Sequence, residues 1–159
     1  ASPLERAVQT ATAIAQPHGL PVQVEPRLGE IRMGKLEGLP LDQIAAHYPG
    51  LREQYRVAPD SVRFPDGETI AEVQARAVAW VEEARQQHSQ DTIAVVSHAD
   101  VLKAILVYYL GMSLSHLHRL ALTTGSLTTL DLTDQAVRLL GHNFVPPAPG
   151  KEKPYVHIA

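Results

Sequence analysis

Hydrophobic positions recur at helical spacing along much of this chain, most clearly over residues 69–88. Thr69 and Glu72 match the Ser/Thr-x-x-Glu capping box that marks the start of a helix. Apolar residues then follow one face, and charged residues occupy the remaining positions. The members of this apolar stripe are Ile70, Val73, Ala77, Trp80, Val81 and Ala84. The pattern predicts a long helix with one buried face.

The same spacing alternates with short apolar runs elsewhere. Ser2 is expected to cap the first helix, with Pro3 at its first turn and Glu5 completing a second capping box. The continuous apolar run 93–96 between two helices is typical of a strand buried on both faces of a parallel sheet. Further helices are predicted at 2–16, 41–48, 51–57, 101–110 and 113–120, and strands at 22–24, 92–97, 126–132 and 136–141.

The alternation of helices and strands predicts an α/β fold, an open and mostly parallel sheet with helices on both faces. A length of 159 residues fits one domain. Residues 1–145 are expected to form it. Residues 146–159 contain four prolines and are expected to run extended as a C-terminal tail.

Composition narrows the class of partner. The 14 Lys and Arg residues against 17 Asp and Glu give a net charge of −3, which argues against nucleic acid as a partner. Cysteine is absent, which excludes disulfides and thiolate metal sites and fits a cytoplasmic protein. No apolar stretch approaches the roughly 18 residues of a membrane span, so no membrane partner is expected. His116 and His118 diverge on a helix, so no metal site is predicted there.

His98 is the strongest candidate for chemistry. It follows the apolar run 93–96 and precedes a helix, at the sheet edge where α/β proteins bind ligands. Backbone N–H groups at the start of that helix favour an anion. There an imidazole can donate to a phosphate oxygen or transfer a proton. From position alone, this interpretation and a simple hydrogen bond to the backbone have equal weight.

Arg6 and three glutamates are weaker candidates when each is taken alone. Arg6 opposes the dipole of the first helix and suits a phosphate clamp, although a solvated surface arginine is the commoner explanation. Glu30 and Glu37 lie in a glycine-rich loop, where a carboxyl with a raised pKa can protonate a leaving oxygen. Most loop glutamates are only solvated. Glu68 follows the turn 65–67. The turn and the helix cap account for the residues around Glu68 but do not require a glutamate at this position.

Four segments together resemble the motifs of the histidine phosphatase superfamily, the phosphoglycerate mutase-like enzymes. Each is modest alone, but they occur in the family's order over residues 1 to about 145. The small bacterial phosphatase and phosphomutase branches are the most similar. The segments are Ser-Pro-Leu-Glu-Arg-Ala-Val-Gln-Thr-Ala (2–11), Leu-Gly-Glu with the later Gly and Glu-Gly (28–38), Pro-Asp-Gly-Glu-Thr (65–69) and Val-Ser-His (96–98).

The resemblance implies a phosphohistidine mechanism on a small phosphorylated metabolite, without cofactor or metal. Arg6 and His98 would then be the second arginine and second histidine of the phosphate pocket. Glu30 would be the general acid and base, the Ala99 N–H would touch phosphate, and Glu68 would belong to the binding site. Both phosphatase and phosphomutase activity stay open.

The chain also departs from the family pattern. The family has glycine where Ala99 stands, and the Asp100 carboxylate would repel phosphate unless it faces away or caps the helix. The Arg-His-Gly motif that carries the nucleophile is absent, and the chain opens within the Ser-Pro-Leu motif. We therefore expect the later three-quarters of an enzyme without the family's first strand, inactive by itself.

Exposed strand edges would make such a chain marginally stable or pair it with a second copy as a homodimer. A non-catalytic phosphate-binding or interaction module derived from the same fold is the alternative function. An α/β domain of unrelated function is a third and less specific interpretation.

Overall fold

The computed structural model describes residues 1–133 and 135–146 and divides the chain into two compact units. The first unit, Ala1–Leu120, holds every residue proposed for the site. The second, Ala121–Ala159, holds a β-hairpin. Apart from its first residue, the tail predicted at 146–159 lies outside the described residues.

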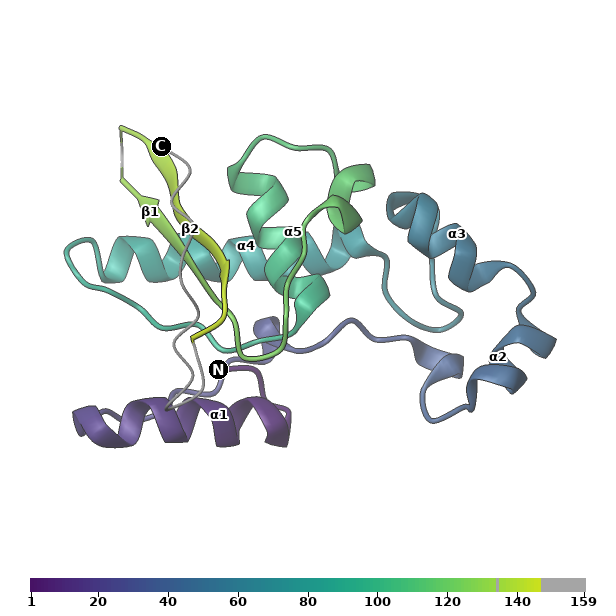
Figure 1. Ribbon diagram of the computed structural model, residues 1–159, viewed down its shortest axis with the longest axis horizontal. Helices are drawn as coiled ribbons and strands as arrows, with labels where there is room; N and C mark the ends of the chain where they lie inside the picture. The colour runs from purple at the N-terminus through teal and green to yellow at the C-terminus, as the bar shows by residue number, and fades with distance from the viewer. Residues whose placement is uncertain (134, 147–159) are drawn as a thin grey trace. The chain divides into compact units, whose positions relative to one another are not determined.

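Helices dominate the first unit (Figure 1). The prediction was right for α3, extended one residue too far for α2 and was within two residues at each end of α4 and α5. Single 3-10 turns and one longer 3-10 segment, Leu114–Arg119, connect the helices. The α-helices are α1 (Glu5–Ala15), α2 (Leu41–His47), α3 (Leu51–Val57), α4 (Ile70–Gln87) and α5 (Ala99–Tyr109). No helix among the described residues is long and apolar enough to cross a membrane.

The long helix α4 forms as its sequence pattern predicts. The Thr69 side chain accepts a hydrogen bond from the Glu72 N–H, and the Glu72 carboxylate accepts one from the Thr69 N–H. Both halves of the capping box are therefore present. Ile70, Val73 and Ala77 of the apolar stripe are fully buried.

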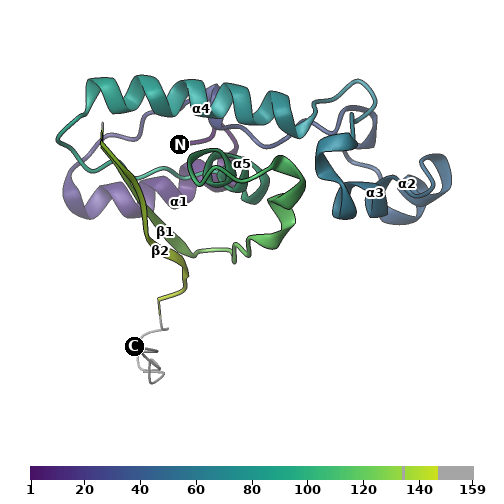
Figure 2. The same cartoon turned by 90° about the horizontal axis from the view of Figure 1, so that it is seen from above.

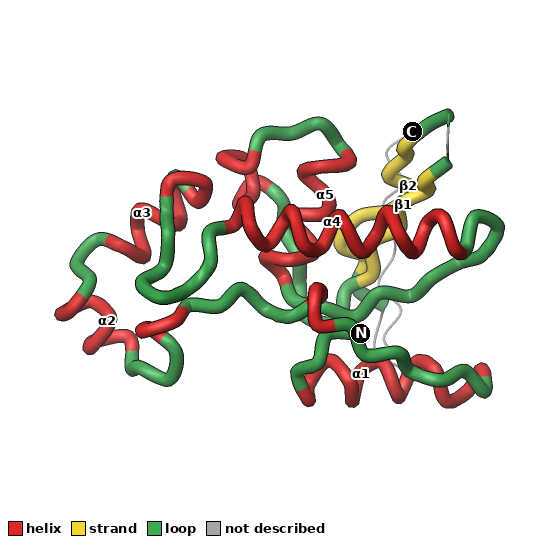
Figure 3. The backbone as a smooth tube through the Cα atoms, turned by 180° about the vertical axis from the view of Figure 1, so that it is seen from behind, coloured by secondary structure: helices red, strands yellow, loops and turns green. Residues whose placement is uncertain are grey.

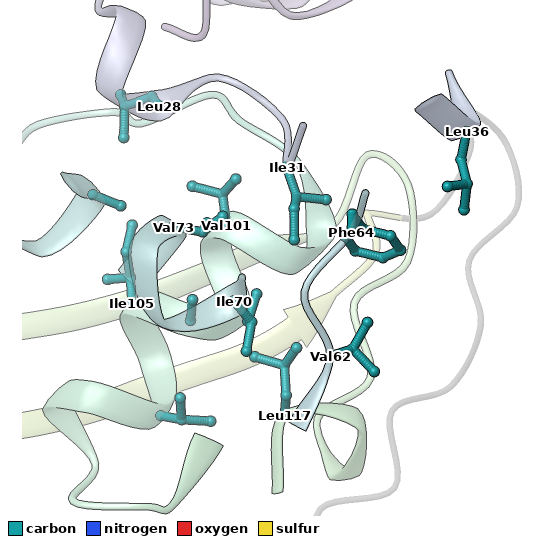
Figure 4. Close-up of a cluster of buried hydrophobic side chains, with 13 residues drawn as sticks. Leu28, Ile31, Leu36, Val62, Phe64, Ile70, Val73, Val101, Ile105 and Leu117 are labelled. Carbon is teal, nitrogen blue, oxygen red and sulfur yellow. The ribbon is translucent and has the colours of Figure 1, made fainter. Parts of the chain in front are cut away.

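The hydrophobic core lies where α4 and α5 pack against each other, and loop residues on both sides complete it (Figure 4). Leu28 and Ile31 enter it from the loop that also carries Glu30. Val101 and Ile105 enter it from α5, the helix that begins directly after His98. The core therefore fixes both the loop and the helix that carry candidate site residues.

The start of α1 differs from the prediction. The N-cap is Leu4, which makes no side-chain capping bond, and Pro3 lies outside the helix. The Ser2 hydroxyl accepts a hydrogen bond from the Leu4 N–H at 3.3 Å and contacts the His98 ring. The predicted capping box is wrong because this hydroxyl has a partner in the interior instead of at the helix end.

The strands predicted at 22–24 and 92–97 carry no β-ladder, and both segments run as loops (green in Figure 3). Each segment bonds the start of the chain instead. The Ala1 amine donates to the Gln23 carbonyl at 2.7 Å, and the Ser2 N–H donates to the Val96 carbonyl at 2.8 Å. A strand requires a paired neighbour, and no described strand pairs with either segment. Ile93, expected to be buried, is 41% exposed.

The arrangement of the first unit nevertheless matches the expected layers. Figures 1 and 3 show the loop segments running between α1 and α4, and Figure 2 shows the N-terminal residues between the same two helices. Helices thus lie on both sides of the layer where the parallel sheet was predicted. Within the described residues, the sheet of this protein is confined to the second unit.

The hairpin of the second unit pairs β1 (Leu127–Leu132) antiparallel to β2 (Val137–Phe144). Both strands were predicted, the second ending three residues earlier than observed. The register is regular from the Leu130–Leu139 pair to the turn and shifts between Leu127 and Leu130. The Thr133 N–H donates to the Ala136 carbonyl across the turn.

Gly34 provides a test of the loop geometry around the site. It has a φ of 54°, and a Cβ there would overlap the Pro65 carbonyl oxygen and the backbone that follows it. Gly38 has a φ of 77° and no atom within 4 Å of such a Cβ. We expect Gly34→Ala to lower the free energy of unfolding by roughly 3 kcal/mol, and Gly38→Ala by only about 1 kcal/mol.

Urea unfolding followed by circular dichroism measures both values. Equal losses in the two variants would contradict the close approach of residues 34 and 65–67.

Candidate active site

The His98 ring is held between two side chains at the start of α5. The residue is the N-cap of this helix in extended conformation, and its side chain is 5% exposed. Its Nε2 lies 2.7 Å from Ser2 Oγ, and its Nδ1 lies 3.1 Å from Arg6 Nη2. Both of these hydrogen bonds are to side chains. The alternative explanation from the sequence, a ring that simply bonds the backbone, is therefore wrong for His98.

Arg6 and Glu30 meet at the same ring nitrogen. One oxygen of Glu30, Oε2, lies 3.5 Å from His98 Nδ1 and 3.7 Å from Arg6 Nη2. The Arg6 side chain is 64% exposed and that of Glu30 is 33% exposed, so an anion can reach the group from solvent. Glu37 is not part of it, because its carboxylate accepts N–H bonds from the local turn.

Burial shifts both titratable groups of this trio toward their neutral forms. Burial raises the pKa of Glu30, and the negative charge of Asp100 raises it further, against smaller opposing effects of the Ile31 N–H, Arg6 and Arg76. Burial lowers the pKa of His98, and the positive charges of Arg6 and Arg76 add to this. A carboxyl whose pKa is raised is a better proton donor near neutral pH.

Glu68 does not join the trio; its buried carboxylate pairs with Arg76 of α4, whose side chain is 20% exposed. Arg76 Nε and Nη2 donate to the two Glu68 oxygens at 2.9 and 3.1 Å, and the Arg32 N–H adds a third bond at 3.0 Å. Burial would raise the pKa of Glu68, but the bonds from Arg76 and Arg32 outweigh it and lower that pKa. Direct contact of this ionised carboxylate with phosphate stays a prediction.

Arg76 is the functional neighbour that sequence reasoning missed. Its guanidinium also donates to the Arg27 carbonyl at 2.6 Å and to the Glu30 carbonyl at 3.2 Å, so it holds the backbone that presents the Glu30 carboxyl. The sequence did offer one indication of this role: Arg76 is a charged residue between Val73 and Ala77, two members of the buried stripe of α4.

The structure shows how the chain accommodates its two departures from the family pattern after His98, which are Ala99 and Asp100. Ala99 is the first residue of α5 and has no positive φ, so alanine is accommodated there. Its N–H is one of those at a helix start that lack intrahelical partners. The Asp100 carboxylate accepts a hydrogen bond from the Tyr55 hydroxyl of α3 at 2.8 Å. Burial and Asp100 raise the pKa of Tyr55, so this phenol remains a donor.

An arginine, a carboxyl and a histidine thus meet at the start of α5, a set of side chains that can bind an oxyanion and exchange a proton. Residues 1–145 match the family model of the histidine phosphatase superfamily (branch 1), and the chain belongs to this superfamily.

Curated relatives include both phosphatases and mutases. The chain is 35% identical over 114 residues to phosphoserine phosphatase 1 of Hydrogenobacter thermophilus, a match covering 72% of this chain and 54% of that protein. It is 32% identical over 130 residues to the probable phosphoglycerate mutase GpmB of Yersinia pestis, covering 82% of this chain and 60% of that protein. The chain thus spans between about half and three-fifths of these relatives.

Solved structures confirm the phosphoglycerate mutase-like α/β fold class. YhfR of Bacillus stearothermophilus has a TM-score of 0.86 at 26% identity, with 91% of this chain and 72% of that chain covered. A mycobacterial glucosyl-3-phosphoglycerate phosphatase in complex with inorganic phosphate has a TM-score of 0.80 at 27% identity, with 91% and 75% covered.

The buried Arg76–Glu68 pair can be tested against an exposed pair. We expect Arg76→Met to lower the free energy of unfolding by about 3 kcal/mol, because it leaves the buried Glu68 carboxylate with only the Arg32 N–H and the exposed Arg32 guanidinium, 3.5 Å away. Adding Glu68→Gln in the same protein should recover part of this loss. Arg63→Met breaks the exposed pair with Glu72, whose side chains are 61% and 48% exposed, and should lower the free energy of unfolding far less, because solvent screens this pair.

Urea titrations of the variants provide the comparison. Losses of similar size for Arg76→Met and Arg63→Met would show that the Arg76 network does not stabilise the fold.

Proposed function

We propose that the protein is a phosphomonoester phosphatase or phosphomutase that works through a phosphohistidine intermediate. The observation that carries the proposal is the convergence of Arg6, Glu30 and His98, whose charged or ring atoms lie within 3.7 Å of one another. These residues come from α1, a loop and the start of α5. Their association is what charge stabilisation and proton transfer at a phosphate ester require.

In the proposed reaction, the family's nucleophilic histidine attacks phosphorus and the bond to the leaving oxygen breaks. The Glu30 carboxyl gives its proton to that oxygen. For hydrolysis, the resulting carboxylate takes a proton from the water that attacks phosphorus, and the P–N bond breaks to free the histidine and inorganic phosphate. Arg6, His98 and the Ala99 N–H hold the phosphoryl oxygens throughout, as positioning and electrostatics dominate phosphoryl transfer.

The nucleophile is proposed to lie outside these 159 residues. The chain has no Arg-His-Gly motif, and it spans only part of its curated relatives. These residues would then supply one half of the phosphate pocket. The alternative is a non-catalytic phosphate-binding or interaction module, which keeps Arg6 and His98 but never receives a nucleophile.

The substrate class we propose is a small phosphorylated metabolite. The relatives named above are a phosphoserine phosphatase, a probable phosphoglycerate mutase and a glucosyl-3-phosphoglycerate phosphatase, each named for such a compound. A homodimer and a cytoplasmic location remain predictions from the sequence.

Turnover by the full-length protein tests the site. With p-nitrophenyl phosphate as substrate, we expect Arg6→Ala, His98→Ala and Glu30→Gln each to reduce kcat/KM by roughly 10²- to 10⁴-fold. Arg119→Ala and His116→Ala change residues of the same types in the segment Leu114–Arg119 and serve as controls with near-normal rates.

Near-normal rates in the three site variants would overturn the assignment. The 159-residue chain alone should show no turnover. Phosphate binding by a full-length protein that never turns over would instead favour the non-catalytic alternative.

The pH profile tests the role of Glu30 as the acid. The acid must be protonated, so kcat/KM should fall as the pH rises through the pKa of Glu30. Asp100→Asn removes a charge that raises this pKa and keeps an acceptor for Tyr55, so this limb should move to lower pH. Asp42→Asn, on α2, should leave the limb in place. An unmoved limb in Asp100→Asn would exclude Glu30 as the titrating acid.

A further inference from the structure

Ser2 is a fully buried polar residue that the proposed mechanism does not use. Its hydroxyl oxygen lies 2.7 Å from His98 Nε2 and accepts the Leu4 N–H at 3.3 Å. Its own N–H donates to the Val96 carbonyl, two residues before the histidine. The serine is therefore fixed by its backbone on one side of the ring, with its oxygen directed at one ring nitrogen.

The contacts of the ring determine where its proton lies. Two contacts oppose each other at Nδ1: Arg6 Nη2, at 3.1 Å, can only donate and favours an unprotonated nitrogen, whereas Glu30 Oε2, at 3.5 Å, favours a protonated one. At Nε2 the Ser2 oxygen can accept the proton of a neutral ring, and this contact tips the balance toward Nε2–H. The hydroxyl oxygen accepts from both Leu4 and His98, which its two lone pairs permit.

We propose that Ser2 is a positioning residue that holds His98 in the Nε2–H tautomer, and that His98 takes up a proton on Nδ1 when a tetrahedral oxyanion binds. The second half of this proposal rests on the proposed function. With Nε2–H committed to Ser2, the ring can donate to an oxyanion only through a newly protonated Nδ1. That proton comes from solvent.

The charges around the ring explain why the proton is absent before the anion binds. Arg6 from α1 and Arg76 from α4 disfavour an imidazolium, as does burial. On the other side are the Glu30 carboxyl, which burial and Asp100 shift toward its neutral form, and Asp100 itself, which is bonded to Tyr55. A bound dianion offsets the charge of Arg6 and faces Nδ1, so it favours the imidazolium.

Ring-nitrogen NMR of the full-length protein, labelled with ¹⁵N in its histidines, tests the first half. We expect His98 to carry its proton on Nε2 in the wild type and in Ser2→Thr, which restores a hydroxyl. Ser2→Ala should lose this preference. Ser97→Ala is the matched control, because that neighbouring serine bonds the Leu28 carbonyl at 2.7 Å and not the ring.

Two results would overturn the role of Ser2. One is an Nδ1–H tautomer in the wild type, which needs no variant to fold. The other is a spectrum of folded Ser2→Ala in which His98 is unchanged.

Sulfate titration tests the second half, because sulfate remains a dianion over the range from about pH 5 to about pH 8 in which histidine titrates. Wild-type affinity should rise as the pH falls through this range, with His98 becoming doubly protonated on binding. Ser2→Ala should weaken binding roughly tenfold by removing a charge-assisted bond, while Ser2→Thr stays near the wild type.

The outcomes separate the two proposals. Sulfate that binds without protonating His98 overturns the proton uptake. Sulfate that leaves His98 unperturbed at every pH contradicts the proposed phosphate pocket, while the tautomer in the wild type and Ser2→Ala still decides the role of Ser2.

Discussion

The guanidinium of Arg76, four-fifths buried, makes the contacts on which the arrangement of the site depends. Glu30 lies in a loop whose regular structure is limited to single 3-10 turns, so no helix or strand ladder fixes it. Arg76 bonds both oxygens of Glu68 and the carbonyls of Arg27 and Glu30. The buried Glu68 carboxylate is costly to keep without a cation and hydrogen-bond donors around it. These bonds therefore fix the loop, α4 and the segment before α4 as one arrangement.

The electrostatics of the site follow from this arrangement. Burial lowers the pKa of His98, and the positive charges of Arg6 and Arg76 lower it further, so all three favour the neutral imidazole. Burial and Asp100 act on Glu30 so that its carboxyl holds its proton more strongly than a solvated one. The site thus combines a carboxyl of raised pKa with nearby cations, which suits a ligand that brings its own negative charge.

The sequence predicted the local elements well wherever their cause is local. The stripe and capping box of α4 and the hairpin in the second unit formed as expected, since side-chain periodicity and turn residues act over a few positions. The strands at 22–24 and 92–97 did not form ladders, because a ladder depends on a neighbour that periodicity cannot provide. Ser2 failed as a helix cap for a related reason: its partner, His98, is 96 residues away.

By itself, the sequence determined the superfamily, through four short motifs in order, and it named Arg6, Glu30 and His98 as candidates. Only the tertiary structure decided that these three meet, that Glu68 is paired with Arg76, and that Asp100 faces Tyr55. The physical reason is the sequence separation over which each kind of interaction acts. Helix periodicity and caps act within a few residues, whereas the partner of a buried polar group depends on which distant segments the core brings together.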